Sequence, residues 1–268
     1  MHDTWASGLT PPWMTQLASR CTTARTAMWR PGPRGLVGFV AGALLSLVVS
    51  AVLLVTPRAS GPGALVDRDL RAWGRWWLRA LRADVEVSGL DNVTPGQPYV
   101  IVANHQSALD PMAVLAALPF GVRFLAKAEL FRLPLFGAAM HRVGMVAVDR
   151  GSVDARAVST GAAEVLASRR SLLVFPEGTV SADGTFLPFK PGAFAIAVAN
   201  AVPILPVTII DSRIAWPVGQ GRVAARPVAV RVVVGEPLPT EGLVLRDIVR
   251  LRAQARDAVA TPYARLER

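Results

Sequence analysis

The sequence predicts an α/β fold, a mixed and largely parallel sheet flanked by helices, with an N-terminal membrane helix or helical hairpin. Three observations lead to this prediction. An uncharged apolar run of 21 residues, 35–55, lies near the N-terminus. From residue 85 onwards, short apolar runs alternate with helix-like stretches, as in domains whose strands are joined by helices. Polar clusters follow three of those runs, and ligands bind at the carboxyl ends of such strands.

The composition favours a membrane-associated protein and excludes several kinds of site. The chain has 268 residues, 52% of them hydrophobic, with a mean hydropathy of +0.38 and a formal net charge of +10. This length suffices for one full core with an appendage. The positive charge comes mainly from Arg and suits either nucleic acid or anionic lipid. With one Cys and three His, the chain offers no internal disulfide and neither a Cys-cluster nor a His-rich metal site.

The N-terminal part is expected to hold a disordered basic tail and a membrane helix. Residues 1–34 mix Thr, Ser, Pro, Gly and Arg, which is typical of disorder. The apolar run that follows would span about 31 Å as a helix, long enough to cross a bilayer, and a buried core helix is the alternative. Arginines flank this run on both sides, so the positive-inside rule does not decide its orientation. A one-leaflet hairpin, with both flanks on the same membrane face, removes the conflict.

Residues 66–82 are expected to form an amphipathic helix. Leu70, Trp73, Trp77 and Leu81 fall on one helical face, and five arginines fall on the opposite face. This pattern is typical of a helix in the membrane interface, and equally of a helix that packs its Trp face on the core. The chain therefore divides into a tail (1–34), a membrane-anchoring unit (35–82) and an α/β domain (83–268).

Seven strands and five helices are expected in the α/β domain. The strand candidates are residues 85–87, 99–103, 123–126, 145–148, 172–175, 204–210 and 228–234. The helix candidates are residues 111–118, 130–143, 153–167, 191–200 and 243–258.

Residues 104–110 connect the second strand to the first helix of this domain and hold a His and an Asp. Asp110 followed by Pro111 is the expected start of a helix, with Asp110 as the N-cap and His105 in the preceding loop. On one continuous helix, a spacing of five would place the two side chains about 140° apart. A loop-to-helix turn lets them meet, as a general base requires. The simpler alternative is a helix cap and a loop residue without chemistry.

The nucleophile for such a base is not evident in the chain. No Ser or Cys is obviously attached to the pair, although Ser107 lies between its members. The proton would then come from a hydroxyl on the substrate.

Two further polar clusters follow later strands. Residues 144–150 end in Asp149 and Arg150, and Arg suits bidentate recognition of phosphate. Residues 175–179 read Phe-Pro-Glu-Gly-Thr, a stiff turn that exposes Glu177 and Thr179. Simple loops, with Arg150 paired to a carboxylate and Glu177 in solvent, are the alternatives.

These motifs, in this order, resemble those of the 1-acylglycerol-3-phosphate acyltransferases, the lysophosphatidic acid acyltransferases of phospholipid synthesis. The His-x4-Asp motif lies at 105–110, and a Gly followed six places later by Arg lies at 144–150. The Phe-Pro-Glu-Gly-Thr block lies at 175–179, and residues 202–207 resemble a fourth, Pro-containing block. The resemblance covers roughly residues 65–240.

The resemblance implies an enzyme that transfers a fatty acyl group to the free hydroxyl of 1-acylglycerol-3-phosphate and forms phosphatidic acid. His105 would deprotonate that hydroxyl, and Asp110 would orient the His. The acyl donor would be acyl-CoA or acyl carrier protein, with no metal or prosthetic group. The expected surroundings are the cell membrane, with the active site at its cytoplasmic face, and no nucleic-acid partner.

The resemblance also implies an acceptor site. Arg150 would bind the phosphate of the lyso-lipid, with Lys127 as an additional contact. Glu177, Gly178 and Thr179 would shape the site around it.

One departure from the family pattern concerns the acceptor. Many members continue the third block with Arg and then Ser, whereas Val180 precedes Ser181 in this chain. A lyso-ornithine lipid, or a lysophospholipid with a larger head group, is therefore an alternative acceptor. Two other classes remain open: a transacylase, which would act without a thioester donor, and a non-catalytic membrane-binding protein, which would not need His105.

Overall fold

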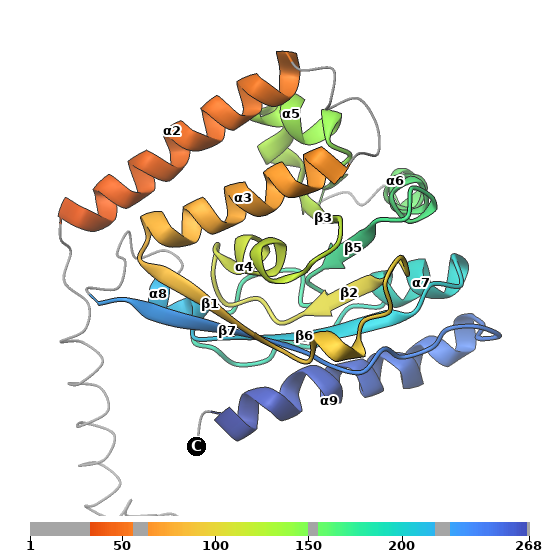
Figure 1. The fold of residues 1–268 in the computed structure, drawn as a ribbon. Helices are drawn as coiled ribbons and strands as arrows, with labels where there is room; N and C mark the ends of the chain where they lie inside the picture. The colour runs from red at the N-terminus through yellow and green to blue at the C-terminus, as the bar shows by residue number, and fades with distance from the viewer. Residues whose placement is uncertain (1–32, 56–63, 150–154, 218–225, 267–268) are drawn as a thin grey trace, which may run out of the picture.

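The computed structural model describes residues 33–55, 64–149, 155–217 and 226–266. These ranges form a seven-stranded sheet with helices on both faces, so the predicted α/β fold is confirmed. In Figure 1, α3 and α4 cover one face, α9 covers the other, and α2 forms an outer layer on α3. Of the predicted tail, residues 1–32 lie outside the described ranges, and residues 33 and 34 belong to α2.

The sheet is mixed and largely parallel, as predicted. Its strands are β1 (Ala83–Ser88), β2 (Val100–Ala103), β3 (Val122–Lys127), β4 (Val146–Val148), β5 (Ser171–Val174), β6 (Ile204–Ile210) and β7 (Val228–Val234). Their order is β1-β7-β6-β2-β5-β3-β4, and among the described pairs only β6 and β7 run antiparallel. Val102 of β2 lies beside Val174 of β5 and Pro206 of β6, so the ends of these strands share one edge.

The central strands are continuous apolar runs because both of their faces are covered. Within β2, Ile101 faces the core beneath α3 and α4, whereas Val100 and Val102 face the core beneath α6, α7 and α9. The covering helices are α4 (Asp110–Ala117), α5 (Phe136–Arg142), α6 (Ala155–Ala167), α7 (Gly192–Ala199), α8 (Ser212–Ala215) and α9 (Ile248–Leu266). Short 3-10 turns are η2 (Leu90–Asn92), η3 (Ala128–Arg132) and η4 (Leu245–Asp247).

Two helix predictions in the domain are wrong in their extent. The single helix expected at 130–143 is divided into η3 and α5, because Pro134 cannot donate a backbone hydrogen bond and Leu135 has a φ of +60°. The helix expected at 243–258 begins at Ile248 and continues to Leu266. Its buried stripe of Leu251, Ala255 and Val259 extends to residue 263, which holds the last turns on the sheet.

The two N-terminal helices, α2 (Pro33–Val55) and α3 (Ala64–Ala80), pack closely together along a row of small residues on α2. At Gly42 an added Cβ would lie 2.6 Å from the ring of Trp77. Four residues further on, the Ser46 hydroxyl accepts the indole N–H groups of Trp73 and Trp77, each at 2.9 Å. The Trp face of α3 is therefore buried in the protein, as the core-packing interpretation predicted.

The outward face of α2 is apolar and exposed. Residues 36–55 are long enough and apolar enough to cross a membrane, by length and composition. Because α2 lies along α3, the two helices match the predicted helical hairpin (Figure 1). The exposed apolar side chains on α2 are Leu36, Val37, Phe39, Val40, Leu44, Leu47, Val48, Val52 and Val55.

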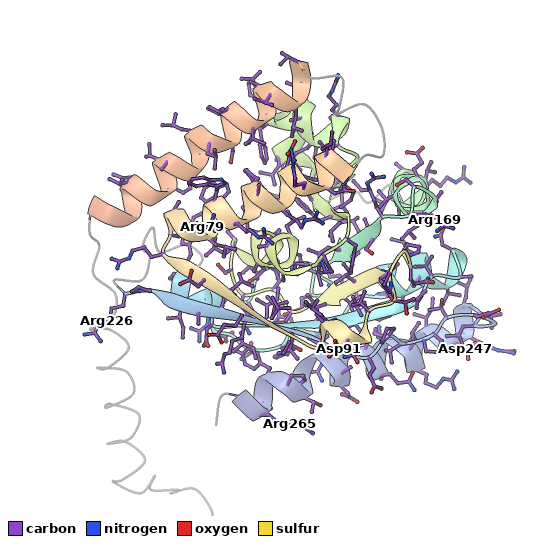
Figure 2. The ribbon with its side chains drawn as sticks, in the orientation of Figure 1. Arg79, Asp91, Arg169, Arg226, Asp247 and Arg265 are labelled. Atoms are coloured by element: carbon purple, nitrogen blue, oxygen red, sulfur yellow. The ribbon has the colours of Figure 1, made fainter. Side chains whose placement is uncertain are left out.

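The exposed basic residues are spread over different elements. Figure 2 labels Arg79 on α3, Arg169 before β5, Arg226 before β7 and Arg265 on α9, all of which are exposed. The positive charge of the described surface is therefore dispersed over several elements.

We expect Gly42→Leu to destabilise the protein by about 1–3 kcal/mol, the usual cost of overpacking. The new side chain would push α2 away from the ring of Trp77. Ala41→Leu is the matched control, because Ala41 is exposed on the same helix. Thermal unfolding in detergent measures both variants, and equal losses would contradict close packing at Gly42.

Candidate active site

The loop that leaves β2 is fixed where it begins. The side-chain amide of Asn104 donates to the carbonyl of Ile209 and accepts the N–H of the same residue, each at 2.7 Å. Asn104 is buried, so this exchange takes place away from solvent. It ties the end of β2 to β6 immediately before His105.

His105 and Asp110 meet as expected: His105 Nδ1 lies 2.7 Å from Asp110 Oδ2. The same carboxylate oxygen accepts the backbone N–H groups of Gln106 at 2.7 Å and Ser107 at 2.8 Å. Asp110 is the first residue of α4 and Leu109 is the N-cap, so the predicted N-cap position was one residue too late. The carboxylate turns back onto the preceding loop and draws that loop around itself.

The imidazole of His105 is held on its face as well as at its edge. Its ring stacks on Phe175 with 3.9 Å between ring centroids and 15° between planes. The N–H of His105 donates to Glu177 Oε1 at 2.9 Å, and its carbonyl accepts the N–H of Ser181 at 2.8 Å. The turn after β5 therefore positions the His. With Nδ1 on Asp110, Nε2 is the nitrogen left for a substrate.

Glu177 is buried, so its interpretation as a solvated turn residue is wrong. Its second carboxylate oxygen accepts the N–H of Leu187 at 2.9 Å. Glu177 thus joins the His105 loop to residue 187. Burial raises the pKa of this carboxyl above its ordinary value, and the two backbone hydrogen bonds oppose the rise. Its predicted contact with the acceptor stays a prediction.

The other predicted binding residues differ in their surroundings. Gly178 has a φ of +74°, which favours glycine, and Thr179 beside it is exposed. Lys127 pairs with Glu129 at 2.9 Å, and both side chains are about half exposed. Arg150 lies outside the described residues. The substrate contacts predicted for all four therefore stay predictions.

Several residues of the loop support it in ways that the sequence did not reveal. Gln106 donates to the carbonyl of Gly184 and accepts the hydroxyl of Tyr263 from α9, each at 3.2 Å. The Ser107 hydroxyl donates to the carbonyl of Trp216 at 2.6 Å. These partners lie about 80 to 160 residues away along the chain. The sequence therefore shows that the loop is polar, but not which distant residues it contacts.

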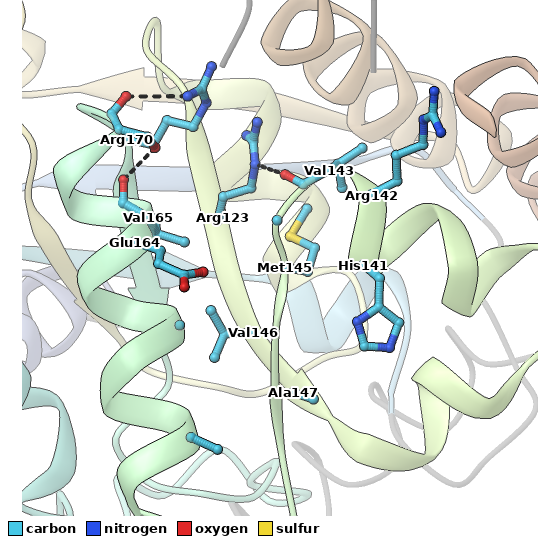
Figure 3. A pocket seen from close by; sticks show the side chains of 14 residues that line it. Arg123, His141, Arg142, Val143, Met145, Val146, Ala147, Glu164, Val165 and Arg170 are labelled. Atoms are coloured by element: carbon cyan, nitrogen blue, oxygen red, sulfur yellow. Dashed lines mark hydrogen bonds between the residues drawn. The ribbon is translucent and has the colours of Figure 1, made fainter. Parts of the chain in front are cut away.

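Two of the cavities bordered by described residues lie at opposite ends of the parallel strands, outside the His-Asp contact. One, of about 280 Å³, borders Phe175 and Gly178. The other, of about 540 Å³, borders Arg123 at the start of β3, at the opposite end of the parallel strands (Figure 3). In the larger cavity, Arg123 pairs with Asp67 at 2.8 Å, and Arg170 pairs with the same carboxylate at 3.2 Å. Its two buried guanidinium groups thus share one carboxylate.

We expect the stability of the wild type relative to Glu177→Gln to be greatest at low pH. A raised pKa means that the folded state binds the proton more tightly than the unfolded state does. The wild type should therefore lose stability, relative to this variant, as the pH rises from below 4.5 through the raised pKa. Melting temperatures of both proteins over a pH series measure this, and a constant difference would contradict it.

Three comparisons with known proteins extend this description. A model of the family described as Acyltransferase matches residues 84–210. A 1-acyl-sn-glycerol-3-phosphate acyltransferase alpha of Homo sapiens is 36% identical over 67% of this chain and 63% of its own length. The chain thus spans under two thirds of that relative.

Two further proteins are similar over more of their length. A lyso-ornithine lipid O-acyltransferase of Pseudomonas aeruginosa is 33% identical over 81% of this chain and 88% of its own. The crystal structure of the 1-acyl-sn-glycerophosphate (LPA) acyltransferase PlsC from Thermotoga maritima superposes with a TM-score of 0.73. It is 26% identical, and the match covers 87% of this chain and 95% of that one.

Proposed function

We propose, from the premise that the chain belongs to the acyltransferase family, that it is a membrane-associated enzyme acylating the free hydroxyl of 1-acylglycerol-3-phosphate. The family predicted from the four motifs is confirmed by the comparisons. The observation that carries the proposal is the buried contact between His105 and Asp110 at the carboxyl edge of the sheet. The product of this reaction is phosphatidic acid.

The contact between the two side chains supports a general-base mechanism. Asp110 accepts the Nδ1–H of His105, which leaves the Nε2 lone pair to take the proton of the acceptor hydroxyl. The alkoxide oxygen then attacks the thioester carbonyl, the C–O bond forms, and the C–S bond breaks. The leaving thiolate takes the proton from the imidazolium. Asp110 stabilises that imidazolium while it exists.

Direct transfer between the substrates is supported by the state of the nearby serine. The Ser107 hydroxyl already donates to the carbonyl of Trp216 and accepts the N–H of Leu109. It is therefore poorly placed to act as a nucleophile. We propose that the thioester, from acyl-CoA or acyl carrier protein, reacts with the acceptor directly and without a metal or prosthetic group.

The oxyanion of the tetrahedral intermediate requires a hydrogen-bond donor. The backbone N–H groups of His105, Gln106 and Ser107 already donate to Glu177 and Asp110. The hydrogen-bond donor to the oxyanion must therefore come from another group than these three.

Membrane association is supported by the exposed apolar face of α2 and by the exposed Trp76 on α3. A helix that presents one apolar face can enter one leaflet without crossing the bilayer. We propose that the hairpin of α2 and α3 lies in the cytoplasmic leaflet, which would bring the active site to the cytoplasmic face of the cell membrane.

A lyso-ornithine lipid is the second candidate acceptor. Val180 stands where many family members have Arg, and the lyso-ornithine lipid acyltransferase of Pseudomonas aeruginosa matches this chain over 88% of its own length. Both acceptors would present a hydroxyl to His105, and the anion beside it would be a phosphate in one and a carboxylate in the other.

The test is acyl transfer by the purified protein in detergent. Radiolabelled acyl-CoA or acyl carrier protein would be supplied with 1-acylglycerol-3-phosphate, lyso-ornithine lipid or lysophosphatidylglycerol. We expect label in phosphatidic acid. Label in ornithine lipid alone would favour the second acceptor, and transfer without any thioester would indicate a transacylase. No transfer under any of these conditions would overturn the proposal.

A further inference from the structure

The larger cavity, beside the starts of β3 and β4, has a positively charged lining. It holds about 540 Å³ and extends from these strands to α6. That volume is within the usual range of ligand sites. The charged side chains among the described residues that line it are Arg123, Arg142, Arg170 and Glu164. Three arginines and one carboxylate give this lining a net positive charge.

The two buried arginines have less negative charge beside them than would balance their own. Arg123 and Arg170 share the carboxylate of Asp67, and Figure 3 shows their guanidinium groups next to each other. Their side chains are only 2% and 8% exposed. Glu164 is exposed and forms no ion pair with the other described residues. One buried positive charge is therefore left unbalanced, and burial of such a charge is costly.

Arg123 also has hydrogen-bond donors to spare. Its Nε donates to the carbonyl of Val143, and its Nη1 contacts the carbonyl of Val122 and the carboxylate of Asp67. Within the described part of the chain, Nη2 has no hydrogen-bond partner. A guanidinium carries five N–H donors in a planar fork that matches phosphate oxygens. The buried side chain thus lacks the acceptor that an oxyanion in the cavity would supply.

The position of the cavity brings it near the proposed membrane surface. Val143, directly after α5, and Met145 line both this cavity and a smaller space that α2 borders through Ser50 and Leu53. In the proposed arrangement the outward face of α2 contacts lipid, so the phosphates of phospholipid head groups would be close to the cavity.

We propose that this cavity is a second ligand site, which binds a phosphate group on Arg123 and Arg170. The bound phosphate would accept the free N–H groups of Arg123 and balance the charge that Asp67 leaves over. The site is separate from the His105 site, because it lies at the other end of the parallel strands. The phosphate comes from a phospholipid head group or from free phosphate, and the two sources are distinguished by binding.

The first test measures binding of radiolabelled inorganic phosphate to the full chain in uncharged detergent, by equilibrium dialysis. Glu164→Gln removes an exposed carboxylate from the cavity lining and should tighten binding about two- to tenfold, the effect of one unit charge at a partly exposed site. Ser168→Glu adds a carboxylate to the same lining and should weaken binding by a similar factor.

The matched control is Glu241→Gln, the same change at an exposed residue that does not line the cavity. It should leave phosphate binding unchanged. Any phosphate at the His105 site would bind the wild type and these variants alike. Equal affinities in the wild type, Glu164→Gln and Ser168→Glu would therefore overturn the proposal.

A further variant tests the buried donor. Arg123→Met removes the unpartnered Nη2, and we expect it to weaken phosphate binding at least about tenfold, the effect of a lost charged hydrogen bond. Undiminished binding in a folded Arg123→Met variant would overturn the proposal. Thermal unfolding checks the fold, and if this variant is unfolded, the Glu164 and Ser168 variants decide.

A lipid arm identifies the source of the phosphate. Radiolabelled phosphatidylglycerol in uncharged micelles would be bound to the same variants. Dependence on Glu164 and Ser168 with the lipid assigns the site to a phospholipid head group, and dependence with inorganic phosphate alone assigns it to free phosphate. Dependence with neither overturns the proposal. No acyl donor is present, so the result does not depend on whether the proposed acyl transfer occurs.

Discussion

Replacing His105 with Ala should lower the rate of acyl transfer at least about a hundredfold, the low end of general-base contributions. The imidazole of His105 bonds to Asp110, and in the proposed mechanism this contact prepares Nε2 to accept a proton. Removing it leaves the acceptor hydroxyl, which is a weak nucleophile until it is deprotonated. The effect should therefore fall on kcat more than on the KM of either substrate.

The control for this prediction is the second described histidine. His141 lies on α5, is exposed, and borders the larger cavity at the other end of the strands. His141→Ala should transfer acyl groups at the wild-type rate. Circular dichroism and thermal unfolding would show that both variants are folded. Full activity in a folded His105→Ala variant would remove the imidazole from the mechanism.

The strands were the most predictable part of the fold because they are buried on both faces. A strand covered on both sides is a short apolar run bounded by turn residues, and β2 and β6 are almost entirely of this kind. Helix ends were less predictable. The break at Pro134 and the extension of α9 to Leu266 depend on the packing of those segments against the domain, which the local sequence does not report.

The site was predictable where its members are close in the sequence. His105 and Asp110 are five residues apart, so the turn between them allowed their contact, and the family resemblance favoured it over a simple helix cap. The supporting contacts of Gln106 were not predicted, because its partners Gly184 and Tyr263 lie 78 and 157 residues away in the chain.

Asp67→Asn should destabilise the protein by about 3–5 kcal/mol, the cost of removing one partner from a buried ion pair. Asp67, in the first turn of α3, contacts Arg123 of β3 at 2.8 Å and Arg170 at 3.2 Å. Both arginine side chains are at least nine-tenths buried. Burial already lowers the pKa of Arg123, and the charge of Asp67 opposes that shift. Without the carboxylate, two buried cations would face each other uncompensated.

The comparison with Asp69→Asn isolates burial as the cause. Asp69 is on the same helix and pairs with Arg68, but that pair is exposed, so its loss should change the free energy of unfolding by at most about 0.5 kcal/mol. Chemical denaturation in detergent measures both variants, and equal losses would contradict the assignment. Because Asp67 joins α3 to the start of β3, the ion pair also attaches α3 to the seven-stranded sheet. Loosening of α3 in Asp67→Asn should therefore accompany the loss of stability.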